Sequence, residues 1–302
     1  MLRSLLLSLI VCSLPARAEA QAGNRALPPE IFRASARAAA LPEPAAAQAA
    51  APAPEPAKGP SRITFSECHV EGPYIAFTFD DGPHPTQTPR VLKMLKERNI
   101  KATFFCLGKC VAQSPEVAKQ IVEEGHEIAN HSWDHPQLNK MEEAAVKDQL
   151  DRAHNVIKQT TGVTPTLMRP PYGAFTTAQR TWANAVWNYK VILWDVDSLD
   201  WKHRTPAKTE SIIMKETKNG SIILCHDIHK TTIDAMPATL DALLAKGFKF
   251  VTVTELLKMH HEPAPKKKGQ PAKPATAPVA DDPKKPQPAS ETPPAPGGGA
   301  AQ

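Results

Sequence analysis

Several kinds of feature are scarce in this chain of 302 residues, and each shortage excludes a class of protein. There are five cysteines and no C-x-x-C pair, which excludes a zinc ribbon and a thioredoxin-like redox motif. No glycine-rich phosphate loop follows a strand-like segment, which argues against a nucleotide-binding protein. The net charge of +5 is modest, and no basic patch is interleaved with aromatic residues, so no nucleic-acid partner is expected.

Long apolar runs are also missing, apart from one near the start of the chain. Arg3 precedes the apolar stretch 5–14, and small residues follow it, so residues 1–20 are predicted to be a secretory signal peptide. The stretch is too short to span a bilayer, although an uncleaved leader would act as an anchor. We therefore expect a secreted protein, periplasmic or extracellular according to the envelope of the cell.

Large apolar residues are rare outside the middle of the chain. Residues 21–61 are mostly alanine and proline and are predicted to be a disordered linker. Residues 262–302 are rich in proline, lysine and alanine and cannot bury enough surface to order themselves. Lysines outnumber carboxylates there, so the tail would either touch an anionic envelope weakly or serve as a solvated spacer. Residues 62–261 remain for one domain, expected to be monomeric.

Residues 62–261 alternate regularly between strand-like and helix-like segments. Strands are predicted at 74–79, 102–106, 127–130, 166–168, 191–196, 221–225 and 248–252. Helices are predicted to begin at Thr88–Pro89 and Ser114–Pro115, and to cover 141–159, 177–187, 206–218, 233–246 and 253–260. Repeated β-α units imply parallel strands and right-handed crossovers. The expected fold class is therefore α/β, a distorted (β/α)7-type barrel, with an open doubly wound sheet as the alternative.

Polar residues follow the carboxyl ends of the predicted strands. They are Asp80 and Asp81 after the first strand, His131 after the third, Arg169 after the fourth, Asp197 after the fifth and His226 after the sixth. The carboxyl ends of the strands form the face on which α/β barrels carry their sites. These side chains are therefore expected to meet in one site.

The chemistry of the first three residue types indicates a metal site. Adjacent carboxylates such as Asp80 and Asp81 resist joint ionisation, and a nearby cation removes that cost. His131 and His135 face one point if their segment turns like a helix. One Asp and two His leave a coordination position open for water, as in catalytic zinc sites. Zinc is expected, cobalt or nickel would also fit, and an Asp–His ion pair without metal is the alternative.

Five ordered motifs resemble those of the polysaccharide deacetylases, carbohydrate esterase family 4. They are TFDDG at 78–82, HSWDH at 131–135, RPPYG at 169–173, DSLDW at 197–201 and LCHD at 224–227. The resemblance covers roughly residues 72–258 and implies the NodB-homology fold for the catalytic domain. It also implies a divalent metal cofactor and a polysaccharide substrate.

The resemblance implies that Asp81, His131 and His135 are the metal ligands, in agreement with their chemistry. Asp80 is expected to be the general base, because a carboxylate beside a metal-activated water can take its proton. Arg169 would keep Asp80 ionised and aimed, whereas an exposed ion pair would contribute little.

His226 is expected to be the general acid that protonates the leaving amine, because histidine titrates near neutral pH. The resemblance implies that Asp200 binds its ring and holds it charged. It also implies that the backbone N–H of Tyr172 helps to hold the oxyanion and that Trp201 forms a wall of the sugar-binding groove.

The expected activity is metal-dependent N-deacetylation of N-acetylglucosamine-type units in peptidoglycan or a chitin-like polymer. The same attack by water would serve an O-acetyl esterase acting on acetylated xylan or another glycan. A third possibility is an inactive glycan- or wall-binding protein. Against that possibility, every residue that the chemistry requires is present.

Four cysteines remain after removal of a leader that contains Cys12. Export to an oxidising space permits disulfides, and a bridge from Cys68 to Cys106 or Cys110 is one hypothesis. Cys225 lies in an apolar run and is expected to be a small buried hydrophobic residue.

Overall fold

The computed structural model describes residues 62–262. The predicted signal peptide, the linker and all of the tail beyond Glu262 lie outside the described residues. Among the helices of residues 62–262, none has both the length and the apolar character that crossing a membrane requires.

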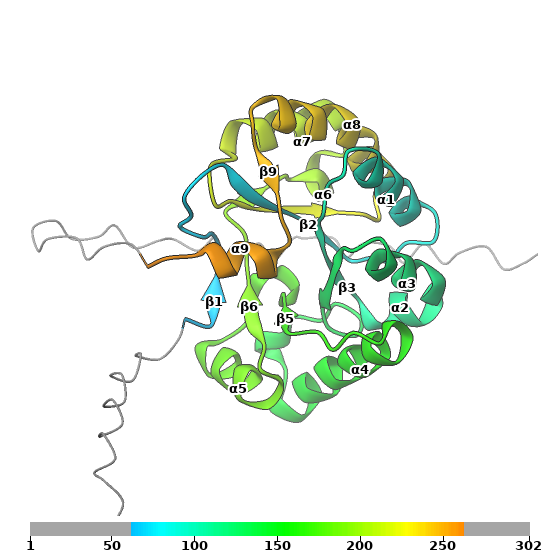
Figure 1. Cartoon of the computed structure of the whole chain (residues 1–302). Helices are drawn as coiled ribbons and strands as arrows, with labels where there is room; N and C mark the ends of the chain where they lie inside the picture. The colour runs from blue at the N-terminus through cyan, green and yellow to red at the C-terminus, as the bar shows by residue number, and fades with distance from the viewer. Residues whose placement is uncertain (1–61, 263–302) are drawn as a thin grey trace, which may run out of the picture. The chain divides into compact units, whose positions relative to one another are not determined.

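Within the described residues, nine strands form a parallel sheet that curls around a central core (Figure 1). Their bounds are β1 Thr64–Phe65, β2 Tyr74–Asp80, β3 Thr103–Cys106, β4 Glu127–Asn130, β5 Leu167–Met168, β6 Lys190–Ile192, β7 Val196–Asp197, β8 Ile222–His226 and β9 Lys249–Phe250. The strand order is β1-β6-β5-β4-β3-β2-β8-β7, and β9 pairs with β2. The predicted fold class, parallel strands curled into a distorted barrel, is confirmed.

Helices surround the strands (Figure 1). Their bounds are α1 Gln87–Glu97, α2 Gly108–Gln113, α3 Pro115–Glu123, α4 Glu143–Thr161, α5 Thr177–Trp187, α6 Asp200–His203, α7 Pro206–Glu216, α8 Lys230–Ala245 and α9 Val253–Met259. Ser114 is the N-cap of α3, as predicted. The predicted cap at Thr88 is wrong, because α1 starts after Thr86 and Thr88 is buried within it.

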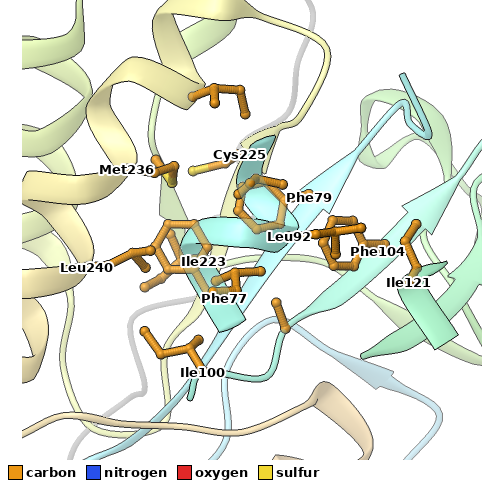
Figure 2. Packing of buried hydrophobic residues seen from close by; sticks show 14 of the residues in the cluster. Phe77, Phe79, Leu92, Ile100, Phe104, Ile121, Ile223, Cys225, Met236 and Leu240 are labelled. Carbon is orange, nitrogen blue, oxygen red and sulfur yellow. The ribbon is translucent and has the colours of Figure 1, made fainter. Parts of the chain in front are cut away.

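The alternation of side chains along β2 separates an outer core from an inner one. Phe77 and Phe79 face outward and pack with residues of the surrounding helices, among them Leu92 and Met236 (Figure 2). Ala76 faces inward and belongs to a second cluster with Phe105, Ala129, Ile192 and Leu256. Thr78 and Asp80 share the inward face with Ala76, so the strand delivers a carboxylate to the enclosed side of its carboxyl end.

Helix α9 lies across the opposite end of the inner core. The N–H of Val253, its first residue, donates to Oγ1 of Thr103 at the start of β3 (2.9 Å). The N–H of Thr254 donates to the Glu127 carboxylate at the start of β4 (3.1 Å). The amino ends of these strands are thereby covered, while the carboxyl ends are left for the polar site.

The strand predicted at 191–196 is wrong, because two short strands of different partners lie there. β6 pairs with β1 and β5, whereas β7 pairs with β8. Between them the Asp195 carboxylate accepts hydrogen bonds from the N–H of Ile222 (2.7 Å) and the hydroxyl of Ser221 (2.9 Å). These side-chain bonds add to the backbone bond from the Asp195 N–H to the Ile222 carbonyl (3.3 Å) at the start of β8.

The proposed disulfide is also wrong, because the four cysteines of the described residues are free thiols. Cys68 belongs to the inner core, near Phe65 and Leu256. Cys106 belongs to the outer core, on the other face of the sheet. The buried Cys225 also lies in the outer core, as the apolar run around it predicted.

Candidate active site

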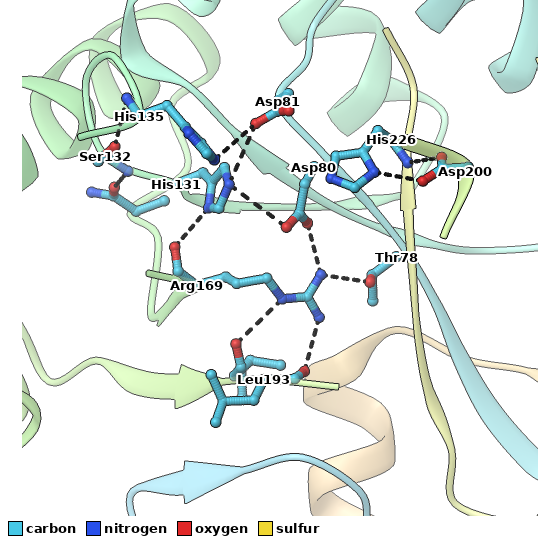
Figure 3. A network of polar contacts seen from close by, with 12 residues as sticks. Thr78, Asp80, Asp81, His131, Ser132, His135, Arg169, Leu193, Asp200 and His226 are labelled. Atoms are coloured by element: carbon cyan, nitrogen blue, oxygen red, sulfur yellow. Dashed lines mark hydrogen bonds and ion pairs between the residues drawn. The ribbon is translucent and has the colours of Figure 1, made fainter. Parts of the chain in front are cut away.

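Arg169 lies fully buried at the carboxyl end of β5 and organises the centre of the site (Figure 3). Its Nη1 donates to Asp80 Oδ1 and to Thr78 Oγ1, both at 2.7 Å. Its Nε and Nη2 donate to the carbonyls of Ile192 (3.3 Å) and Leu193 (3.0 Å). The guanidinium therefore holds Asp80 in one orientation and balances its charge, and the alternative of an exposed ion pair is excluded.

Asp81, His131 and His135 converge on one point beside Asp80. Nε2 of each histidine lies 3.5 Å from Asp81 Oδ1, and one ligand atom from each residue lies within 4.8 Å of the others. The Nδ1–H of His131 donates to the carbonyl of Arg169 (2.7 Å), which directs its Nε2 toward Asp81. His131 Nε2 also lies 3.6 Å from Asp80 Oδ2.

These atoms fit a divalent cation. Asp81 Oδ1 is buried and has no hydrogen-bond partner, and an unsatisfied buried carboxylate oxygen is costly. Burial alone would raise the pKa of Asp81, but His135 and His131 hold it well below its usual range, so the carboxyl stays ionised. A carboxylate and two imidazole nitrogens around an open point are the donors that zinc prefers.

The backbone of the site is held in unusual conformations. Positive φ angles occur at Asp81 (75°), Ser132 (70°), His135 (70°) and Tyr172 (60°). A residue other than glycine in the left-handed region costs about 1–2 kcal/mol, and such strain tends to collect at functional sites. The left-handed conformation at Asp81 directs its carboxylate toward His131 and His135, whereas the neighbouring Asp80 carboxylate contacts Arg169.

His226 ends β8 and is the register partner of Asp80 on β2. Its backbone N–H and Nδ1 each contact the Asp200 carboxylate at 2.8 Å, and Thr232 donates to the same carboxylate at 2.7 Å. Burial opposes the charge on the ring, but Asp200 outweighs it and raises the pKa of His226 to about 9. Burial alone would raise the pKa of Asp200, yet the partner histidine lowers it to about 2.

The two expected substrate-binding residues are Tyr172, which lies beside the metal-ligand candidate His135, and Trp201, which lies beside Asp200. The Tyr172 ring packs edge-on against His135, with the ring centroids 4.6 Å apart. Trp201 follows Asp200 directly, and its backbone N–H donates to Asp200 Oδ1 (2.8 Å). Both side chains are half-buried.

Sequence reasoning missed several supporting residues. Thr78 precedes Asp80 by two positions in β2, so the strand period could have placed it on the same face. Thr232 comes from α8 and carries no spacing signal that links it to Asp200. Thr88 donates to the buried carboxyl of Asp227, whose pKa is raised to about 7, mainly by burial.

Comparisons with known proteins identify the family. The family model for polysaccharide deacetylases matches residues 69–191. The peptidoglycan-N-acetylglucosamine deacetylase PgdA of Listeria monocytogenes is 44% identical over 182 residues, which are 60% of this chain and 38% of the relative. The chain thus spans little more than a third of that relative's length.

Two solved structures are similar along most of their length. The Bc1960 peptidoglycan N-acetylglucosamine deacetylase is 32% identical, with a TM-score of 0.63 over 67% of this chain and 96% of its own. A protein of Bacillus anthracis described as a CE4 family pseudoenzyme is 29% identical, with a TM-score of 0.62 over 65% of this chain and 69% of its own. The chain belongs to the polysaccharide deacetylase family.

Proposed function

We propose that the protein is a metal-dependent N-deacetylase that hydrolyses the acetamide of N-acetylglucosamine-type units in peptidoglycan or a chitin-like polymer. The products are acetate and a free amine. One observation carries the proposal: three metal-ligand atoms lie within 4.8 Å of one another, in a site that also holds a carboxylate oriented by Arg169 and a histidine paired with Asp200. The names of the relatives agree with this reaction.

Asp81, His131 and His135 would hold the metal, with zinc proposed as the physiological ion. When bound, such an ion lowers the pKa of a water and polarises a carbonyl group. Asp80 lies beside these residues with one oxygen held by Arg169 and the other 3.6 Å from His131 Nε2. We assign Asp80 to take a proton from the attacking water.

His226 lies on the side of Asp80 away from His131 (Figure 3) and would donate a proton to the leaving amine. Asp200 occupies its Nδ1, so Nε2–H is the donor left for the substrate. The nitrogen of an amide is a poor leaving group until it is protonated, whereas the oxygen of an ester leaves more readily. A histidine with a pKa of about 9 therefore favours N-deacetylation over the esterase alternative.

The remaining functional assignments belong to the same proposal. The backbone N–H of Tyr172 would stabilise the oxyanion of the tetrahedral intermediate, and Trp201 would form a wall for a sugar ring. The protein would be exported by residues 1–20 to the periplasm or the cell exterior and act as a monomer. The lysine-rich tail would contact an anionic envelope weakly.

The inactive alternative has weight because a pseudoenzyme shares this fold. An inactive protein is expected to have lost part of the catalytic set. Here all four residues are present, and they form two short polar pairs, Arg169 with Asp80 and His226 with Asp200. That complete set supports an active enzyme.

The test is acetate release from N-acetylated chito-oligosaccharides and from peptidoglycan. We expect chelation to abolish release and zinc to restore it. Asp80→Asn should lower kcat by about 10²–10⁴-fold, because it removes the proton acceptor, while zinc content measured by mass spectrometry stays unchanged.

Acetylated xylan serves as the matched substrate in the same assay. Release from xylan and not from chitin or peptidoglycan would establish the esterase instead. No release from any of the three substrates by a zinc-loaded protein would favour the inactive alternative. An Asp80→Asn variant with the full rate would refute the assignment of the base.

A further inference from the structure

The segment from His131 to His135 must return two imidazoles to one point without the help of a regular helix. It follows β4 and lies outside any helix or strand. Ser132 and His135 both adopt left-handed backbone conformations, at φ 70°. Because such conformations are unfavourable for these residue types, the segment needs contacts that hold its shape. Two are local: the Ser132 N–H donates to Asn130 Oδ1 (2.7 Å) and the His135 N–H donates to Ser132 Oγ (3.1 Å). The others come from the elements packed against it.

Gln149 in α4 contacts the middle of this segment through its whole amide group. Its Oε1 accepts hydrogen bonds from the N–H of Trp133 (2.9 Å) and of Asp134 (3.2 Å). Its Nε2 donates to Asp134 Oδ1 (2.8 Å). Gln149 is 8% exposed, so these hydrogen bonds are formed largely out of competition with water.

The other side of the segment is held by the start of α2. The N–H groups of Gly108 and Lys109 donate to the carbonyls of Ser132 and Trp133, both at 3.0 Å. A Cβ on Gly108 would lie 2.6 Å from Trp133 Cε3, so the two segments are in close contact. Gln149 therefore accepts from the N–H groups of Trp133 and Asp134, and α2 donates to the carbonyls of Ser132 and Trp133.

We propose that Gln149 is a positioning residue for the metal ligands, an inference that rests on the proposed metal site. By binding two successive N–H groups between the histidines, it fixes the turn that brings His135 back beside His131. An amide suits this place better than an acid, because it accepts from the backbone and also donates to Asp134. Its hydrogen bonds to Trp133 and Asp134 act on the backbone that joins the two histidines.

The experiment measures the zinc dissociation constant by competition with a chromophoric chelator. Gln149→Met keeps the size of the side chain and removes all three hydrogen bonds, and we expect zinc to bind about tenfold more weakly. Gln120→Met in α3 is the matched control, because within residues 62–262 the Gln120 amide hydrogen-bonds only the Glu124 side chain (2.9 Å). Zinc affinity of the control should equal that of the wild type.

Exchanging the amide and the carboxylate between positions 149 and 134 tests the same contact with polar side chains at both positions. Gln149→Glu keeps the acceptor but faces the Asp134 carboxylate, so zinc affinity should fall. Adding Asp134→Asn restores a donor–acceptor pair with the roles exchanged, and affinity should recover. This pair of variants decides the question if Gln149→Met does not fold.

The outcomes separate the two proposals. Wild-type protein that binds no zinc would overturn both the metal site and the role of Gln149. Wild-type protein that binds zinc, with wild-type affinity in Gln149→Met or in Gln149→Glu, would overturn the role of Gln149 alone. A residue that merely stabilised the fold would lower the unfolding temperature of the metal-free protein without changing the dissociation constant.

Discussion

At the scale of single residues, the pair of His226 and Asp200 would control the proton in the proposed reaction. The carboxylate binds both the ring and the backbone N–H of the histidine and is itself fully buried. The lowered pKa of Asp200 and the raised pKa of His226 mean that the pair stabilises the folded protein fully between about pH 3.8 and pH 6.5, the ordinary pKa values of the two groups. This contribution is lost as the pH rises through about 9.

We therefore expect kcat to fall on the alkaline side near pH 9, where His226 loses its proton. Asp200→Asn removes the charge that holds this proton while burial remains. The alkaline limb should then move to lower pH, and kcat at pH 8 should fall. The measurement is kcat as a function of pH with saturating substrate.

Thr232→Val is the graded control for this prediction. It removes one hydrogen bond to the Asp200 carboxylate and keeps the charge, so its limb should shift less than that of Asp200→Asn. Identical alkaline limbs in the wild type and Asp200→Asn would show that another group sets the profile.

The candidate site residues followed from sequence where motif and chemistry coincide. Asp80, Asp81, His131 and His135 were placed by their types and by their position after strands, and the structure brings them together. The contacts that orient them were not predictable in the same way. Nothing in the local sequence around Gln149 connects it with the segment 15 residues earlier.

At the scale of secondary-structure elements, the turn before β8 depends on close approach of two backbones. Gly220 has φ 83°, and a Cβ there would lie 1.8 Å from the carbonyl oxygen of Cys68. The Cys68 N–H donates to the Gly220 carbonyl (2.9 Å). A side chain at position 220 must therefore push the segment after β1 away from the strand that carries His226.

We expect Gly220→Ala to destabilise the protein by about 2–4 kcal/mol, through the positive φ and the steric overlap together. Gly162→Ala is the control, because Gly162 has φ 75° but no atom within 4 Å of the added Cβ. It should cost only about 1–2 kcal/mol, from the positive φ alone. Urea unfolding measures both, and equal losses would show that the overlap is relieved without cost.

Secondary-structure elements were predictable where several residues in a row follow a helical or strand-like hydrophobic pattern. α5 occupies residues 177–187 as predicted, and β4 occupies 127–130. The two-residue strand β1 and the division between β6 and β7 were not predictable, because strands of two or three residues are too short to show a hydrophobic pattern. β6 joins the sheet by pairing with β5, and β7 joins it by pairing with β8, so the two strands lie toward opposite ends of the strand order.

At the scale of the whole molecule, the metal would link segments far apart in the chain. Asp81 follows β2, whereas both histidines follow β4, and binding would hold these two parts of the domain together. A ligand that binds only the folded protein stabilises it by about 2.7 kcal/mol at a hundred times its dissociation constant.

Removal of the metal should therefore lower the unfolding temperature by roughly 5–10 °C for a domain of this size. Thermal unfolding of chelator-treated protein before and after zinc is returned measures the effect. His135→Ala should show little response to zinc, because it removes one of the three ligands. A wild-type unfolding temperature that is independent of zinc would contradict metal binding at this site.

The sequence by itself determined the α/β class, the face of the sheet that carries the site, and the residues able to bind metal or move protons. These follow from local periodicity and from side-chain chemistry, which are written along the chain. Tertiary structure alone decided that Arg169 is buried against Asp80, that the cysteines are unpaired, and that Gln149 and Thr232 support the site. Those contacts join residues from separate helices and strands, and they depend on how the helices dock on a sheet whose closure no local pattern specifies.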